Sequence, residues 1–218
     1  MVEFSMSSST LVPYETRLDR DQLWALREGS MHFEKESAVF QTLRKITSKL
    51  EELGIPYAIA GGMALFLHGY RRFTEDVDLL VTPEGLTKLH EKLDGLGYLP
   101  PFANSKQLRD TETGVRIEFL VAGQYPGDGK PKEVAFPDPM THVIEESGMR
   151  VLSIPKLIEM KLASGLTAPH RGRDIVDVQE VIAKLDLPQA LTEQLSPMVQ
   201  DKYRELWCLV QSTPLDER

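Results

Sequence analysis

The spacing of apolar residues in the first quarter of the chain predicts two helices. An imperfect amphipathic pattern over residues 17–29 predicts the first. Apolar residues then recur at three- and four-residue spacing from Phe33 to Leu53, with charged residues between them, which predicts a second helix. Gly54 follows directly and is suited to the left-handed position that ends a helix.

A different pattern begins at Pro56. The apolar run 57–60 predicts a short buried strand, Gly61-Gly62 a tight turn, and residues 63–68 a short helix that ends at Gly69. Residues 77–81 predict a second strand. Thr82 followed by Pro83 is a helix start, and that helix is expected to run to about Leu96.

The rest of the chain predicts a hairpin, a long loop and several helices. Residues 106–110 and 114–121 form the expected hairpin, and 122–141, rich in glycine and proline, a structured loop. Short strands are expected at 143–145 and 150–152, and helices at 155–164, 174–185 and 198–210. The order predicts an α/β (α+β) fold: an N-terminal arm (1–33), a core with a small mixed sheet (34–153) and a C-terminal helical part packed on it (154–218).

Composition narrows the function classes. The chain has 218 residues, 41% hydrophobic and 27% charged, which is typical of a globular protein. The net charge of −8 excludes a strongly basic nucleic-acid coat but allows a local basic pocket. One cysteine, Cys208, excludes a disulfide framework and a cysteine-rich zinc site. No signal peptide or membrane-spanning segment is seen, so we expect a cytoplasmic protein without a membrane partner.

Two aspartates begin the second predicted strand. Asp76 and Asp78 lie two positions apart, so both point to one face of the strand, roughly 7 Å apart. Carboxylates that enter a buried strand together repel each other, and a divalent cation offsets that repulsion. Oxygen-only ligands suit Mg²⁺, which completes its shell with water and phosphate oxygens. A turn-capping role for the pair is the weaker alternative.

The glycine pair predicts a phosphate site beside these acids. Gly61 and Gly62 allow close approach to the backbone, and the helix after them directs free N–H groups at the same place. Phosphate at the turn, beside a metal held by two aspartates, is typical of a nucleoside triphosphate site. A plain turn is the alternative.

Glu118 is the candidate third carboxylate. Val115, Ile117, Phe119 and Val121 form one apolar face of their strand, and Glu118 lies on the other. If this strand lies beside that of the two aspartates, Glu118 completes an acidic triad that binds metal or accepts a proton. A solvated residue on an edge strand is the other interpretation.

These segments resemble the nucleotidyltransferase superfamily with the polymerase-beta-like fold. The resemblance is nearer to the bacterial branch that includes AbiEii-type toxins and related nucleotidyltransferases, and it covers roughly residues 34–186. It rests on Gly-Gly-x-Ala at 61–64, Arg-x-Thr-x-Asp-x-Asp at 72–78, Leu-Ile-x-x-Lys-Leu at 157–162 and basic-Asp-x-x-Asp at 173–177. Gly-Gly and Asp-x-Asp are weak signals alone and a strong one together at this spacing.

The resemblance implies roles for particular residues. It implies that Asp76, Asp78 and Glu118 are catalytic and hold Mg²⁺, with two ions expected and Mn²⁺ as a compatible substitute. The nucleotide phosphates are then assigned to Gly61, Gly62, Arg72, Thr74, Lys161 and Arg173, with Asp174 in support. Structural alternatives stay open for several of these: a surface or aspartate-orienting role for Arg72, a solvated Lys161, and a helix cap for Asp174.

The implied activity is metal-dependent transfer of a nucleoside monophosphate from an NTP to a hydroxyl acceptor, with release of pyrophosphate. The acceptor is a protein, a small molecule or an RNA end. Gly62 stands where many transferases have serine, and Glu118 where aspartate is commoner. These departures keep open a catalytically inactive binding module, or a toxin-like component of a toxin–antitoxin pair. The partner expected for a toxin is a cognate antitoxin. A third alternative is a purely structural oligomer, a homodimer in the simplest case, built through the Trp24 and Trp207 helices.

Overall fold

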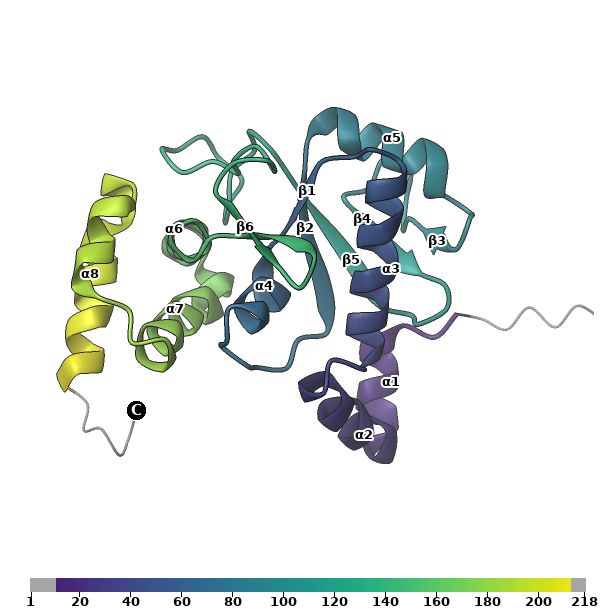
Figure 1. Ribbon diagram of the computed structural model, residues 1–218, viewed down its shortest axis with the longest axis horizontal. Helices are drawn as coiled ribbons and strands as arrows, with labels where there is room; N and C mark the ends of the chain where they lie inside the picture. Colours follow the sequence, from purple (N-terminus) through teal and green to yellow (C-terminus); the bar gives the residue numbers. More distant parts are fainter. Residues whose placement is uncertain (1–10, 213–218) are drawn as a thin grey trace, which may run out of the picture.

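The computed structural model describes residues 11–212 (Figure 1). The strands are β1 (Tyr57–Ile59), β2 (Asp76–Val81), β3 (Tyr98–Leu99), β4 (Gln107–Asp110), β5 (Arg116–Val121), β6 (Val143–Glu146) and β7 (Met149–Leu152). The helices are α1 (Tyr14–Arg20), α2 (Gln22–Phe33), α3 (Ala38–Glu52), α4 (Gly61–Leu67), α5 (Pro83–Leu93), α6 (Ile154–Thr167), α7 (Gly172–Lys184) and α8 (Pro197–Ser212), with 3₁₀ turns η1 (Pro169–Arg171) and η2 (Gln189–Gln194).

The strands form one mixed sheet in the order β3-β4-β5-β2-β1-β7-β6. β2 runs parallel to β5 and antiparallel to β1, while β1 runs parallel to β7. β4 and β5 form the expected antiparallel hairpin. The predicted α/β class, a mixed sheet flanked by N-terminal and C-terminal helices, is therefore confirmed.

β2 lies in the middle of this sheet, and its two faces differ. Val77, Leu79 and Val81 are buried on one face, whereas Asp76 and Asp78 lie on the other face with partial exposure. The alternation follows from the pleat of the strand, which turns successive side chains to opposite faces. β5 pairs with the whole of β2, whereas β1 pairs with its last three residues and the Ala60 amide donates to the Asp78 carbonyl. The segment that carries the two aspartates is therefore held mainly by β5.

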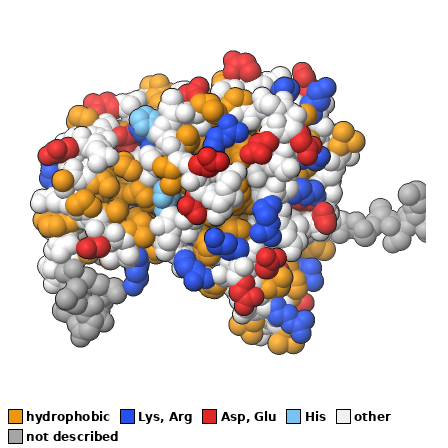
Figure 2. All heavy atoms as spheres, viewed as in Figure 1, with side chains coloured by type: hydrophobic (Ala, Val, Ile, Leu, Met, Phe, Trp, Pro, Cys, Tyr) orange, Lys and Arg blue, Asp and Glu red, His pale blue; other side chains and the backbone are white. Residues whose placement is uncertain are grey.

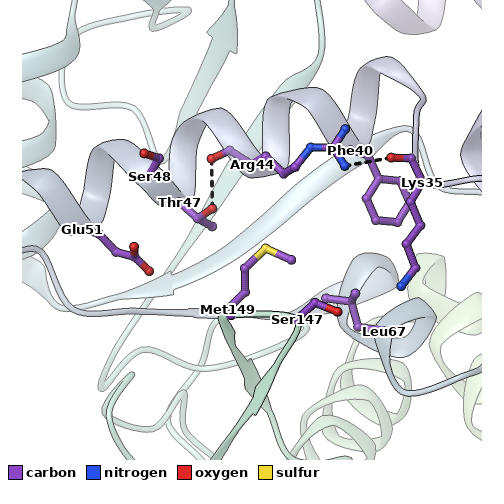
Figure 3. Close-up of a pocket in the computed structure, with 10 residues that line it drawn as sticks. Lys35, Phe40, Arg44, Thr47, Ser48, Glu51, Leu67, Ser147 and Met149 are labelled. Carbon is purple, nitrogen blue, oxygen red and sulfur yellow. Dashed lines mark hydrogen bonds between the residues drawn. The ribbon is translucent and has the colours of Figure 1, made fainter.

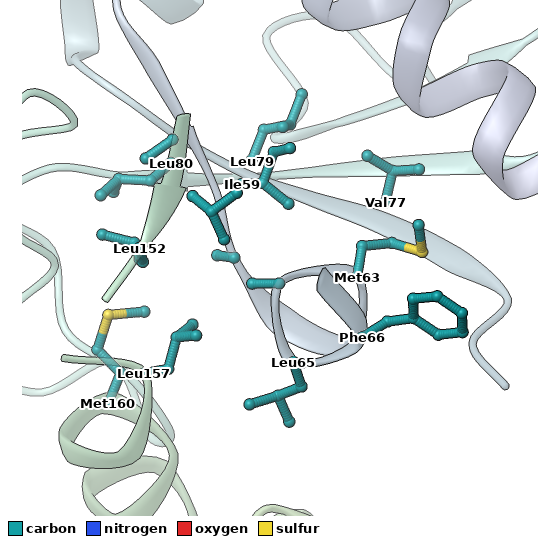
Figure 4. Close-up of a cluster of buried hydrophobic side chains, with 14 of the residues drawn as sticks. Ile59, Met63, Leu65, Phe66, Val77, Leu79, Leu80, Leu152, Leu157 and Met160 are labelled. Carbon is teal, nitrogen blue, oxygen red and sulfur yellow. The ribbon is translucent and has the colours of Figure 1, made fainter. Parts of the chain in front are cut away.

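The core fixes α4 and α6 to the sheet. Figure 4 shows Met63 of α4 beside Val77 of β2, and Leu157 and Met160 of α6 near Leu152 of β7. Beyond α6, α7 and α8 pack successively outward, and α3 and α5 lie across the sheet on the other side of Figure 1. The start of α4 and one side of α6 are thereby held next to the polar face of β2.

Helix boundaries follow local capping. The Thr82 hydroxyl accepts from the Gly85 amide at 3.0 Å and starts α5, as predicted, and Gly54 takes φ +61° after α3. α3 begins later than predicted, because the Ser37 hydroxyl caps it at the Phe40 amide. α5 also ends early, at Leu93.

The single helix predicted over 17–29 is wrong. The chain breaks at Asp21, whose carboxylate accepts from the Trp24 amide and caps α2. Leu23 and Leu26, two of the apolar residues behind the prediction, are 73% and 70% exposed. The strand β3 was not expected. Residues 1–10 and 213–218, including most of the polar serine-rich start of the predicted arm, lie outside the described residues.

Charges of both signs lie on part of the face shown in Figure 2. Figure 2 shows acidic and basic side chains interspersed over the side that carries α1, α2 and α3. Among residues 11–212, no helix is long and apolar enough to cross a membrane.

Candidate active site

Three carboxylates meet on the polar face of β2 and β5. The parallel register places Asp78 directly opposite Glu118, and Asp76 opposite Arg116. Each of Asp76, Asp78 and Glu118 offers a carboxylate oxygen, and these three oxygens lie within 4.8 Å of one another. The expectation that the strand of Glu118 lies beside that of the aspartates is confirmed.

Asp76 is held by two neighbours. The buried Thr74 hydroxyl donates to its Oδ1 at 3.1 Å, and the Arg116 guanidinium donates to its Oδ2 at 2.8 Å. The sequence suggested Arg72 as the arginine that orients the aspartates. The structure gives that contact to Arg116, which sequence reasoning missed because its pairing depends on the register of two strands that are distant in the chain.

Asp78 lacks such support. Among residues 11–212, its carboxylate makes no hydrogen bond or ion pair. Burial, together with the charges of Asp76 and Glu118, raises the pKa of Asp78 from its ordinary value near 3.8 to about 8, although Lys161 and Arg116 oppose the shift. With all three carboxyl groups ionised, the cluster would therefore carry more negative charge than its surroundings neutralise. An all-oxygen donor set with unneutralised charge fits a hard divalent cation such as Mg²⁺.

The glycine turn lies directly against this cluster. Gly61 has φ +58°, and a Cβ built on it would lie 1.7 Å from Oδ2 of Asp78. A Cβ on Gly62 would lie 2.7 Å from Oγ1 of Thr74. Glycine is therefore required at the first position by both conformation and space, and at the second by space alone. The close fit at Gly62 explains why this chain lacks the serine that many transferases carry there.

A compact ion network, formed by residues of α6 and α7 together with Arg72, also lines the cavity. Lys161 Nζ donates to Asp174 Oδ1 at 2.8 Å and to Asp177 Oδ2 at 2.7 Å. Arg72 donates to the same oxygen of Asp177 at 2.9 Å, and the Ser164 hydroxyl donates to Asp174 at 2.7 Å. Two cations and two carboxylates thus balance, so the charge of Lys161 is already shared with two acids. The proposed cap role of Asp174 is wrong, because Arg171 occupies the N-cap position of α7.

The 3₁₀ turn η1 and the start of α7 supply further cations. His170, Arg171 and Arg173 line the cavity, are exposed, and form no ion pair within the described part of the chain. Unlike Lys161, these side chains are free to contact an anionic ligand. The sequence singled out the short basic run 170–173 but could not show that Lys161 is neutralised and these residues are not.

A buried histidine supports the backbone beside Arg72. His32 Nε2 lies 3.2 Å from the Arg72 carbonyl and Nδ1 lies 3.2 Å from the Ser37 hydroxyl. Burial lowers the pKa of His32, so the imidazole stays neutral. A neutral ring that donates through Nε2 and accepts through Nδ1 satisfies both contacts. The N-terminal helices thereby help to hold the segment that contains Arg72 and Thr74.

These features surround one cavity of about 770 Å³. Its lining includes the three carboxylates, both glycines and the ion network, together with Phe136 and Pro126 from the long loop. A cavity of this size accommodates a nucleotide. A second cavity of about 380 Å³ lies between α3 and the β6–β7 turn (Figure 3) and is lined by Lys35, Arg44 and Met149, among others, without a carboxylate cluster.

Comparisons with known proteins gave fold likeness only. No protein-family model matches the sequence. No curated protein matches it either. The solution structure of the antibiotic-resistance factor ANT(2″)-Ia is similar over 78% of this chain and 89% of that chain, with 16% identity and a TM-score of 0.48.

Two further solved structures are comparable. ANT(2″)-Ia in complex with adenylyl-2″-tobramycin matches 79% of this chain and 96% of that chain, at 16% identity and a TM-score of 0.48. An antigenic nucleotidyltransferase-like protein from Paracoccidioides brasiliensis matches 79% and 92%, at 21% identity and a TM-score of 0.42. Likeness at this level leaves substrate and reaction to be argued from the residues of this chain.

Proposed function

We propose that this protein is a metal-dependent nucleotidyltransferase that moves a nucleoside monophosphate from an NTP to a hydroxyl acceptor and releases pyrophosphate. One observation carries the proposal: the Gly61-Gly62 turn at the start of α4 lies against a three-carboxylate cluster, so closely that no side chain fits between them. A phosphate site and a cation site in contact are what a triphosphate substrate with its metal requires.

Two parts of the cavity lining divide the work. The glycine turn offers its backbone to the phosphates, and Arg171 and Arg173 offer unpaired positive charge from another part of the lining, beside the imidazole of His170. Lys161 and Arg72, both tied to Asp177, hold that part of the lining in place and add a weaker field. In this division Thr74 positions Asp76, and Asp174 holds Lys161 in a supporting role.

The transfer balances without a further reactant. The acceptor oxygen forms a bond to the α-phosphorus, the bond from that phosphorus to the bridging oxygen breaks, and pyrophosphate leaves with its electron pair. Glu118, which has no ion pair among residues 11–212, is the carboxylate proposed to take the hydroxyl proton. Divalent cations, proposed to be Mg²⁺ on Asp76, Asp78 and Glu118, would supply charge neutralisation and a more acidic hydroxyl.

The finer assignments rest on sequence motifs. The motifs at 61–64, 72–78, 157–162 and 173–177 support a place in the AbiEii-like branch, whose toxin members would make a cognate antitoxin the partner. A catalytically inactive binding module on the same fold is the rival. It would keep the shape of the cavity without binding metal and NTP together.

Isothermal titration of each of the four common NTPs separates these cases. The wild type is titrated with Mg²⁺ and again with EDTA, beside an Asp76→Ala/Asp78→Ala variant. We expect binding of at least one NTP that needs both the metal and the carboxylates. An NTP that binds would then be used, labelled at the α-phosphate, to screen protein, small-molecule and RNA acceptors.

Glu112→Gln provides the control. This carboxylate lies in the β4–β5 turn, is 75% exposed and does not line the cavity. The Glu112→Gln variant should bind nucleotide as the wild type does. A folded wild type that binds none of the four NTPs would refute the transferase and leave a nucleotidyltransferase-shaped partner protein.

A further inference from the structure

Arg116 occupies the place where a cation is needed. Its guanidinium lies 2.8 Å from Oδ2 of Asp76, and the Thr74 hydroxyl already contacts the other oxygen of that carboxylate. Both oxygens of Asp76 therefore have a partner in the protein without metal. A divalent cation that used Asp76 would meet a positive charge within hydrogen-bond distance of its ligand atom.

The ion pair between Arg116 and Asp76 is weak. Only one nitrogen of Arg116 reaches Asp76, and its Nε is buried with no hydrogen-bond partner in the described part of the chain. The two side chains are 40% and 25% exposed, and ion pairs with such exposure are weak. Glu118 and Glu15 also attract this guanidinium, although Glu15 already pairs with Arg109.

The register and strand order place Arg116 relative to the carboxylates and the glycine turn. Gln107 of β4 lies opposite Glu118, which lies opposite Asp78 of β2, whereas the glycine turn follows β1 on the other side of β2. Arg116 belongs to β5 and lines the cavity together with Gln107. The strand that carries Arg116 therefore lies on the side of β2 away from the phosphate turn. If pyrophosphate leaves toward that turn, as in the proposed function, in-line attack comes from the opposite side.

We propose that Arg116 is a built-in competitor for the divalent cation: it holds Asp76 in the metal-free protein, and cation binding releases it toward the acceptor side of the cluster. The inference rests on the metal site of the proposed function. It makes Arg116 a positioning residue whose place depends on whether the metal is present. The proposal also explains why an arginine lies beside the carboxylates: Arg116 supplies positive charge to Asp76 when no divalent cation is bound.

Binding of Mn²⁺ alone, followed by electron paramagnetic resonance, tests the competition without nucleotide or acceptor. Arg116→Met should bind Mn²⁺ roughly two- to fivefold more tightly than the wild type, because an exposed ion pair has about that strength. Arg116→Lys keeps the charge and should stay within about twofold of the wild type.

Arg109→Met is the matched control. Arg109 lies opposite Arg116 on β4, one strand further from Asp76, and its guanidinium is held by Glu15 at 2.8 and 2.9 Å. Its removal changes the net charge equally, and screening limits the gain in Mn²⁺ affinity to less than about twofold. An equal gain in both methionine variants would show a general charge effect and overturn the competition.

A second measurement uses the wild type, so it tests the proposal even if Arg116→Met does not fold. In the wild type, the ¹⁵N resonance of Arg116 Nε, assigned through Arg116→Lys, should shift on Mg²⁺ addition while that of Arg109 does not. Mn²⁺ binding by the wild type without tighter binding by Arg116→Met, or an unshifted Arg116 signal at saturation, would overturn this inference and leave the proposed function intact. No Mn²⁺ binding by any variant would overturn both.

Discussion

Replacing Asp78 with asparagine should stabilise the metal-free protein at pH 8. The folded protein holds the Asp78 carboxyl against Asp76 and Glu118, and its pKa is raised from near 3.8 to about 8. The folded state therefore binds this proton more tightly than the unfolded chain does. Asparagine has nearly the same shape but never ionises, so it avoids the cost of a buried negative charge.

The direction of the pH dependence follows from the two pKa values. Below about pH 4 both states carry the proton, so the carboxyl adds no penalty. Between about pH 4 and pH 8 the unfolded chain loses the proton and the folded protein keeps it, so the free energy of unfolding falls as the pH rises. Above pH 8 both states are ionised, and the loss is complete.

The size of the effect follows from the shift. One pKa unit corresponds to about 1.4 kcal/mol. The stability advantage of Asp78→Asn over the wild type should therefore widen between pH 5 and pH 8 by up to about 4 kcal/mol. Saturating Mg²⁺ should reduce this advantage, because a bound cation stabilises the ionised wild-type carboxylate and not the amide.

Urea unfolding in EDTA at pH 5, 6.5 and 8, followed by circular dichroism, measures the effect. Asp110→Asn is the contrasting control, because this fully buried aspartate already pairs with Lys45 at 2.9 Å. The Asp110→Asn variant should lose stability, because Lys45 loses its buried partner and keeps only the exposed Glu112 at 3.1 Å. An Asp78→Asn protein that is no more stable than the wild type at pH 8, or an advantage independent of pH, would refute the account of the cluster.

Three further outcomes are expected. Gly61→Ala should lose metal-dependent NTP binding and at least about 2 kcal/mol of stability, because its Cβ would lie 1.7 Å from a carboxylate oxygen. The control Gly95→Ala, at φ +76° with open space around it, should cost only about 1 kcal/mol by urea unfolding. Lys161→Met should destabilise the protein by roughly 3 kcal/mol, because Asp174 and the 4% exposed Asp177 lose a shared cation. Lys202→Met is the control and should be nearly neutral, because the ion pair of Lys202 with Glu205 is exposed. Thr74→Val should weaken Mn²⁺ binding several-fold, since the carboxylate that it orients becomes mobile, whereas unchanged affinity would leave its hydroxyl a structural role only.

Local patterns predicted much of this fold. The alternation in residues 76–81 and 115–121 gave both central strands and the face on which each acid lies, because the pleat alone fixes that alternation. The start of α5 at Thr82 likewise depends on adjacent residues only. The break at Asp21 was missed because the apolar pattern continues on both sides of the cap.

Other parts of the candidate site depend on contacts between distant residues. Arg116 meets Asp76 only because β2 and β5 pair in one register, and Lys161 is neutralised only because α7 folds back on α6. The motif pattern assigned a phosphate role to Lys161, but a pattern does not show which neighbouring acids already share its charge. Such balances become visible once the helices are placed.

The pair Arg72–Asp177 joins residues 105 positions apart, and this has a consequence for biosynthesis. A ribosome that adds 5–20 residues per second needs roughly 5–20 s to make the intervening chain. During that time the strand with Asp76 and Asp78 already exists, but the wall formed by α6 and α7 does not. The cavity can therefore close only after Asp177 and the rest of α7 have been added, and the nascent chain lacks a complete site until then.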